Sequence, residues 1–249
     1  MKSNFSWLAK LAVVSSLWIA TEARATQLTF DVYTNSAKGV THHAPNSTVV
    51  PPSYGDNVSD FDPGALFEGQ YYYRYGSDGG FTPHVTVEYR FWNNPGDNGG
   101  PNGRIWDTGY GDLQYVAYPS VNQSFVEMRF AADFGYRVTL SNFNIAAFGA
   151  SLGGQTVKVV RDAGLPSATT LWSAGPDGGV TVTGGGSHDT YMPNILVADG
   201  HTVSLIYGQS GNIGVDNVVI VESIPEPTAN VLLGAGALLL GRLRVARNG

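Results

Sequence analysis

The stretch Pro-His-Val-Thr-Val-Glu-Tyr-Arg-Phe, residues 83–91, has the cleanest alternation of apolar and polar side chains in the chain. Its apolar positions are Val85, Val87, Tyr89 and Phe91, and the positions between them are polar or charged. A two-residue period of this kind is typical of a β-strand with one face in a core and the other in water. We therefore predict a half-buried strand here.

Further strand-like segments follow one another between residues 26 and 223. They cover residues 27–33, 48–50, 70–75, 113–118, 124–132, 136–148, 155–161, 169–173, 179–183, 201–207 and 213–221. Glycine is abundant, with 32 residues, and charged residues make up only 14% of the chain, a composition typical of strands joined by many turns. About ten to twelve short strands at this spacing predict an all-β fold, a single β-sandwich over residues 26–223 rather than two small domains.

Two features interrupt this regular spacing. Residues 35–62 and 93–103 are rich in Pro, Gly, Asn and Asp, and we expect long loops there. In segment 136–148 the apolar positions shift from Val138 and Leu140 to Phe143 and Ile145. Such a change of face predicts a β-bulge inside that strand.

The N-terminus has the pattern of a secretory signal peptide, residues 1–25. Lys2 and Lys10 are positive, residues 11–20 are apolar, and Ala23-Arg24-Ala25 forms an A-x-A cleavage site. The apolar segment is too short to span a membrane, which takes about 20 residues. We predict an exported chain whose mature form begins near Thr26.

The C-terminus, residues 224–249, has three parts. Pro225, Glu226 and Pro227 come first, and a mostly apolar run from residue 229 to residue 241 follows. The last part is basic and contains Arg242, Arg244 and Arg247. An apolar run followed by arginines predicts a short transmembrane helix at about residues 228–241, with the arginines on the cytoplasmic side.

These three parts, in this order at the chain end, resemble the PEP-CTERM sorting signal of exopolysaccharide-producing Gram-negative bacteria. The resemblance implies a processing partner, an exosortase, that cuts in or near residues 225–227. It also implies transient anchoring in the inner membrane, followed by release to the cell surface or extracellular matrix. The alternative is a plain C-terminal membrane anchor after a proline-rich linker.

The exported part is acidic and lacks cysteine. The whole chain carries a formal charge of −6; without the +2 of the signal peptide and the +3 of the tail arginines, residues 26–227 carry −11. This charge argues against nucleic acid or anionic lipid as a partner and is compatible with divalent cations. With no cysteine there is no disulfide, so burial of a core or a bound metal has to stabilise the fold.

The last predicted strand, Ile-Gly-Val-Asp-Asn-Val-Val-Ile at residues 213–220, resembles the closing strand of galactose-binding-like jelly rolls, a group that includes many carbohydrate-binding modules. The resemblance implies a jelly-roll-like sandwich. It also implies a structural Ca²⁺ between the first and last strands, for which Asp31 and Asp216 are the candidate ligands. The alternative is a pair of exposed or turn-forming aspartates. We predict no other cofactor.

A candidate glycan platform lies around the loop at residues 93–103. Trp92, Trp106 and Tyr110 supply aromatic rings and Arg104 supplies hydrogen-bond donors, which together suit sugar faces and hydroxyl groups. If the tryptophans are instead core residues, the domain is an adhesion module without a small-ligand site. We expect a non-enzymatic structural or glycan-associating component of the exopolysaccharide.

The alternative from another class is a secreted hydrolase of polysaccharide or ester. Ser151 lies in a G-x-S-x-G pattern and is followed by Asp199 and His201, but a strand-like segment comes next where a nucleophile elbow needs a helix. Glu88 and Glu127 are candidate glycosidase carboxylates if the fold brings them together. We interpret two further groups as polar loop residues: Ser187-His188-Asp189 and His42-His43.

Overall fold

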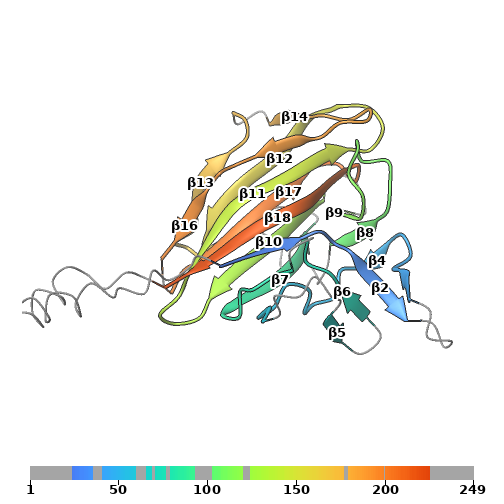
Figure 1. Ribbon diagram of the computed structural model, residues 1–249. Helices are drawn as coiled ribbons and strands as arrows, with labels where there is room; N and C mark the ends of the chain where they lie inside the picture. The colour runs from blue at the N-terminus through green and yellow to red at the C-terminus, as the bar shows by residue number, and fades with distance from the viewer. Residues whose placement is uncertain are drawn as a thin grey trace, which may run out of the picture.

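The computed structural model describes nine segments of the chain: residues 24–35, 41–59, 66–68, 71–76, 79–92, 103–119, 124–176, 179–198 and 200–224. All the regular elements in them are β-strands, and no helix occurs in these segments. Two large sheets pack face to face as a sandwich, and a smaller sheet lies beside them. In Figure 1 the long strands run in one common diagonal direction, with the small sheet below them. The predicted all-β sandwich is confirmed.

The larger sheet has eight strands. Its main path is β15-β11-β18-β9-β8-β4, with β1 added on β18 and β16 on β11. The strands are β1 (Arg24–Leu28), β4 (Thr48–Val49), β8 (Arg104–Trp106), β9 (Val116–Tyr118), β11 (Arg137–Ala147), β15 (Asp189–Tyr191), β16 (Ile195–Val197) and β18 (Ile213–Ser223). The first and last strands of the described chain are therefore direct neighbours.

The opposing sheet has six strands in the order β13-β12-β17-β10-β7, with β14 added on β12. They are β7 (Val85–Trp92), β10 (Phe125–Ala132), β12 (Leu152–Arg161), β13 (Thr169–Ser173), β14 (Val180–Val182) and β17 (Thr202–Gly208). The third sheet, ordered β3-β2-β6-β5, contains β2 (Val32–Asn35), β3 (Thr41–His43), β5 (Leu66–Glu68) and β6 (Tyr71–Tyr73).

The core lies between the two large sheets. Val85, Val87 and Tyr89 of β7 are all buried, as the alternation of that stretch predicts. They join a single cluster that also contains Phe130 of β10 and Ile220 of β18. Full burial of one such side chain is worth about 1.5–3 kcal/mol, so a core of this extent can stabilise the fold without disulfides.

The bulge predicted in segment 136–148 is present. In the pairing of β11 with β18, the register shifts between Leu140 and Asn142, and it shifts again between Asn142 and Asn144. At the second shift β18 has one residue more than β11. The second register shift therefore lies next to Asp216 of β18.

The first strand is shorter than predicted. The segment expected at residues 27–33 is divided into β1 and β2, because Phe30 between them has a φ of 53°. An L-residue in this left-handed region breaks an extended strand. β1 also begins at Arg24, two residues before the predicted mature start at Thr26, and that start stays a prediction.

The sandwich has two distinct ends. At one, which we call the terminal end, β1 begins and β18 finishes, because Arg24 pairs with Glu222. At the other, the distal end, β11 finishes and β18 begins, because Ala147 pairs with Ile213. The eleven residues of β18 separate the two ends by about 33 Å at about 3.3 Å per residue.

The predicted terminal segments lie outside the described residues. This applies to the signal peptide up to residue 23 and to the sorting signal from residue 225, including its transmembrane helix. Among the residues that are described, none forms a helix with the length and apolar character needed to cross a membrane.

Candidate functional site

Trp106 lies in an aromatic cluster outside the main core, on the larger sheet. Its ring makes edge contacts with Tyr118, at 5.7 Å between centroids, and with Phe148, at 6.3 Å. Tyr110 packs behind both, 5.4 Å from Phe148 and 6.0 Å from Tyr118. We call these four residues the Trp106 cluster. Trp106 is half-buried and Phe148 is 44% exposed, so two rings of the cluster reach the surface.

The predicted platform is only partly assembled in one place. Trp106 and Tyr110 lie in the same cluster, but Tyr110 is buried and donates a hydrogen bond to the carbonyl of Gly211 at 3.2 Å. Arg104 and Trp106 are the first and last residues of β8. Trp92 lies in β7 of the other large sheet, where its backbone pairs with Phe125.

Polar groups border the cluster. The Asn46 side chain makes a two-way link to Asp107: its amide donates to the carboxylate at 2.8 Å, and its oxygen accepts from the Asp107 backbone amide at 2.8 Å. Arg104 donates to the carbonyl of Ser47 at 2.7 Å. Asn46, Ser47 and Asp107 are thereby tied together beside Trp106.

Gly109 explains how Phe148 fits into the cluster. Gly109 has a φ of 92°, and a Cβ built on it would lie 2.5 Å from Cε2 of Phe148. Only glycine adopts this backbone and leaves room for the ring. The loop between β8 and β9, residues 107–115, is thus shaped around Phe148.

A second aromatic group lies at the other end of the same loop. The His43 imidazole lies between Tyr115, stacked at 3.8 Å with an interplanar angle of 6°, and Tyr33 at 4.0 Å. The Arg74 guanidinium lies 5.1 Å from the Tyr33 ring on a cation–π contact. Burial lowers the pKa of His43 below its ordinary value, with Asp31 opposing the shift, so the ring is neutral at pH 7.

We call this group the His43 stack. The sequence interpretation of His42-His43 as loop residues missed it, because β3, on which both residues lie, was not predicted. His43 Nδ1 is buried without a hydrogen-bond partner among the described residues. The adjacent His42 is exposed.

Asp31, one of the two predicted Ca²⁺ ligands, lies close enough to the other, Asp216, for its charge to affect the pKa of Asp216. Asp216 is 5% exposed, and burial raises its pKa well above the ordinary value, with the charge of Asp31 adding to the shift. Burial also raises the pKa of Asp31, although His43 and Arg74 act against this. Two carboxylates that are hard to ionise together form a site that favours a cation.

The backbone around these carboxylates is strained. Phe30 next to Asp31 has a φ of 53°, and Asn217 next to Asp216 has a φ of 52°. Tyr115 of the His43 stack has a φ of 57°. Non-glycine residues in this region cost about 1–3 kcal/mol each and are often found at functional sites.

The donor chemistry of this pair fits Ca²⁺, which takes oxygen ligands. Asp216 accepts two hydrogen bonds from Asn217, from its backbone amide at 2.6 Å and from its side-chain amide at 3.0 Å. Within the described segments, no group of three or more His, Cys, Asp or Glu residues is placed to share an ion. Ca²⁺ binding by Asp31 and Asp216 stays a prediction.

The structure separates the residues of the hydrolase patterns. Ser151 precedes β12 directly, so a strand follows it, as expected, and its hydroxyl accepts a hydrogen bond from the Gly184 amide at 3.1 Å. His201 Nδ1 bonds to Asp162 at 2.7 Å. Asp199 lies outside the described residues.

Ser187, His188 and Asp189 do not act on one another as a triad. His188 Nδ1 lies 2.6 Å from the carboxylate of Asp112. Asp189 accepts from the backbone amide and the hydroxyl of Thr183, each at 2.8 Å. His188 and Asp189 therefore bond to different residues and not to each other.

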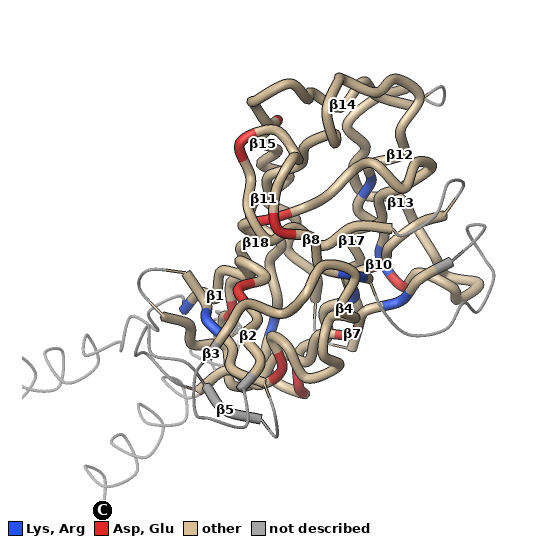
Figure 2. The backbone as a smooth tube through the Cα atoms, turned by 90° about the vertical axis from the view of Figure 1, so that its right-hand side faces the viewer, with Lys and Arg blue, Asp and Glu red and all other residues tan. Residues whose placement is uncertain are grey.

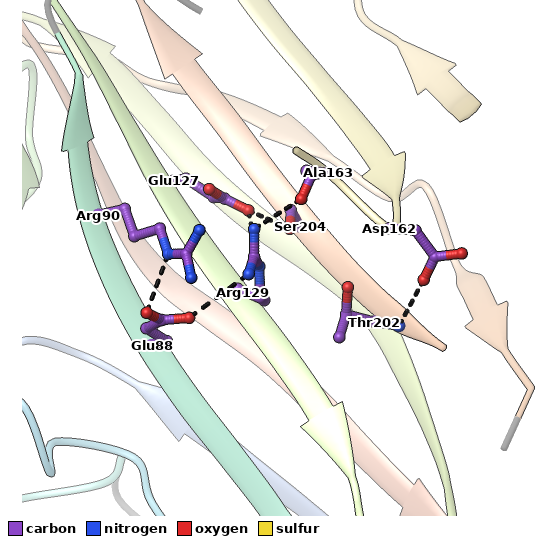
Figure 3. A network of polar contacts seen from close by, with 8 residues as sticks. All are labelled: Glu88, Arg90, Glu127, Arg129, Asp162, Ala163, Thr202 and Ser204. Carbon is purple, nitrogen blue, oxygen red and sulfur yellow. Dashed lines mark hydrogen bonds and ion pairs between the residues drawn. The ribbon is translucent and has the colours of Figure 1, made fainter. Parts of the chain in front are cut away.

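Glu88 and Glu127 lie on the same outer face of the six-stranded sheet, on the adjacent strands β7 and β10 (Figure 3). The Arg129 guanidinium lies between them, with Nε 3.0 Å from Glu127 and Nη1 3.6 Å from Glu88. Glu127 is completely buried and also accepts a hydrogen bond from Ser204 at 2.5 Å. Charged residues elsewhere on the described chain are sparse and scattered (Figure 2).

The residues of the predicted sorting signal lie outside the described residues. They are Pro225, Glu226, Pro227, Arg242, Arg244 and Arg247.

No protein-family model matches the chain, and a search of curated proteins finds no match either. Among solved structures, it is similar to a family 29 carbohydrate-binding module, at 17% identity and a TM-score of 0.27, over 55% of this chain and 88% of that one. A family 4 carbohydrate-binding module gives 11% identity and a TM-score of 0.26, over 55% and 95% of the two chains.

The Podospora anserina GH26-CBM35 β-(1,4)-mannanase gives 13% identity and a TM-score of 0.29, over 57% of this chain. This chain covers only 29% of the mannanase. At such TM-scores neither the fold nor the ligand of these proteins transfers to this chain.

Proposed function

We propose that this chain is an exported, non-enzymatic protein of the bacterial cell surface or extracellular matrix whose β-sandwich associates with glycans. The observation that carries the proposal is the Trp106 cluster, where Trp106 and the 44%-exposed Phe148 present aromatic surface. Sugar rings pack their apolar C–H faces on such rings while nearby polar groups bind the hydroxyls.

The surroundings of the cluster support this proposal. Asn46, Asp107 and Arg104 lie next to Trp106 and supply donors and acceptors. Asn46 and Asp107 bond to each other, and Arg104 donates to the Ser47 carbonyl, so all three side chains are fixed before a ligand arrives, which reduces the ordering cost of binding. Tyr110 and Tyr118 support the two surface rings from below, so the platform is held rigidly.

Exopolysaccharide from the native host, immobilised in an affinity gel, tests glycan binding. Trp106→Ala and Phe148→Ala are expected to weaken retardation at least about tenfold, which corresponds to about 1.4 kcal/mol. Phe134→Ala, which also removes an exposed ring but at the terminal end, is the matched control. Equal binding by all three variants would refute the platform.

The proposal includes sorting through a PEP-CTERM tail, with an exosortase-type enzyme as partner and the inner membrane as a transient anchor. Its support is the tail sequence, together with the course of β18, which leads to residue 224 directly before the Pro225-Glu226-Pro227 triplet. Mass spectrometry of the mature protein from the native host tests it. The tail should be lost in the wild type and retained when the triplet is changed to alanines; an intact tail in both indicates an ordinary membrane anchor.

The positions of Glu88 and Glu127, the candidate carboxylates of the hydrolase alternative, support the non-enzymatic proposal. Glycoside hydrolysis needs two carboxyl groups facing a cleft that the substrate enters. Glu127 is completely buried, and Arg129 pairs with it and with Glu88. Release of reducing sugar from the host exopolysaccharide by the wild type, and not by Glu88→Gln, would overturn this part of the proposal.

A further inference from the structure

Exposed large apolar side chains gather at the terminal end of the sandwich. Phe134 is 94% exposed, Leu165 is 58% exposed and Ile224 is 47% exposed. Leu196 on β16, opposite Thr139 near the start of β11, is also exposed. A protein that only faces water gains nothing from apolar residues collected at one end, and such groups mark surfaces of interaction.

Phe134 occupies the outermost point of a tight turn. It lies in the turn that joins β10 of one large sheet to β11 of the other, and a hydrogen bond from the Tyr136 amide to the Asp133 carbonyl at 3.0 Å closes this turn. Gly135 follows it with a φ of 86°. Turns of this shape usually carry proline or polar residues before the glycine. The turn itself does not require a phenylalanine.

The pairing of the strands brings these residues to the same end. Arg137, the first residue of β11 after the turn, pairs with Ser223, next to Ile224. The loop that carries Leu165 follows β12, and its Asp162 amide bonds to the Thr202 carbonyl at 3.0 Å. Thr202 pairs with Ala131 of β10, just before the β10–β11 turn. Adjacent strands lie about 4.8 Å apart, so the loop and the turn are about two strand spacings apart at the same end of the sheet.

The chain beyond Ile224 indicates what covers this surface. The apolar run of the predicted anchor begins at residue 229, five residues further on. Five residues span at most about 18 Å when fully extended. The terminal end is thus held near the lipid whenever the anchor is inserted.

We propose that the terminal end docks on the bilayer surface, with Phe134 and Leu165 entering the lipid interface. This inference rests on the proposed membrane anchor. Aromatic and aliphatic side chains beside an anchor bind the interface by burying their apolar area in it. The contact fixes the orientation of the sandwich and holds residues 225–227, just beyond Ile224, at the membrane surface.

The absence of cysteine makes a direct test possible. Single-cysteine variants of the full chain, with the tail intact, carry a polarity-sensitive fluorophore at Phe134→Cys or Leu165→Cys. The matched controls are Met192→Cys, 75% exposed on the side of the sandwich, and Phe148→Cys at the distal end. Each protein is reconstituted into vesicles of phosphatidylethanolamine and phosphatidylcholine, some of whose headgroups carry a nitroxide quencher.

Labels at positions 134 and 165 are expected to shift to the blue and to be quenched at least about twofold more than labels at 192 and 148. Equal quenching at all four positions overturns the inference. Flotation of the same vesicles tests the anchor separately. A chain that floats with equally quenched labels contradicts docking alone, whereas a chain that does not float contradicts the anchor and the docking with it.

Discussion

Replacing Arg129 with methionine removes the cation that pairs with the buried carboxylate of Glu127 (Figure 3). Glu127 is 0% exposed, and the Arg129 side chain is 16% exposed. After the substitution, the Ser204 hydroxyl is the one hydrogen-bond donor to this carboxylate that remains among the described residues. Removing one partner of a buried pair costs about 3–5 kcal/mol, so Arg129→Met should lower the free energy of unfolding by that amount. This is a large part of the roughly 5–15 kcal/mol typical of a whole domain.

Urea denaturation at pH 7 measures the effect, and Arg90→Met on the neighbouring strand is the matched control. Arg90 pairs with Glu88 at 2.9 Å, but the Glu88 side chain is 49% exposed, so this pair should be worth at most about 1 kcal/mol. Adding Glu127→Gln to Arg129→Met should recover at least about half of the loss, because a neutral amide needs no counter-charge. The reasoning is refuted if Arg129→Met costs no more than Arg90→Met, or if Glu127→Gln recovers nothing.

Three further predictions concern Asp216, Tyr54 and Gly109. Burial raises the pKa of Asp216, so its carboxyl group holds a proton more tightly in the folded state than in the unfolded state. Without Ca²⁺, the free energy of unfolding should therefore fall as the pH rises above about 4. Adding Ca²⁺ at pH 8 should raise the Tm of the wild type but not that of Asp216→Asn. Tyr54→Phe should lower the free energy of unfolding by about 2–4 kcal/mol, because the Tyr54 hydroxyl accepts hydrogen bonds from the backbone amides of residues 29 and 30 and donates one to the carbonyl of residue 74. An unchanged midpoint in urea denaturation would contradict this. Gly109→Ala should cost about 1–3 kcal/mol and displace Phe148, so a variant that binds exopolysaccharide as well as the wild type does would show that this ring is not used.

Alternation of side chains predicted the long strands well. β7 and β10 are where the sequence places them, and the bulge in β11 could be foreseen because Leu140 and Phe143 lie on the same face only if one residue is extra. Short strands were missed. β15 and β16 have only three residues each, which is too few to show a period.

The site was harder to predict than the fold, because it is made by contacts between distant segments. His43 and Tyr115 are 72 positions apart and stack only because the β8–β9 loop returns to β3. Trp106 and Tyr110 were predicted together, but the sequence carries no sign that Phe148 completes the cluster. The proximity of Asp31 and Asp216 was expected from a resemblance rather than from any pattern in the chain.

The position of β18 decides how a mechanical load would enter the molecule. Its last residue, Ser223, lies at the terminal end, and β18 has β11 on one side and β1 and β9 on the other. A pull on the tail therefore acts along an interior strand. Ladder hydrogen bonds run across the strands, so such a pull shears many of them at once instead of opening them one by one. A surface protein held by this end would resist tension as a unit.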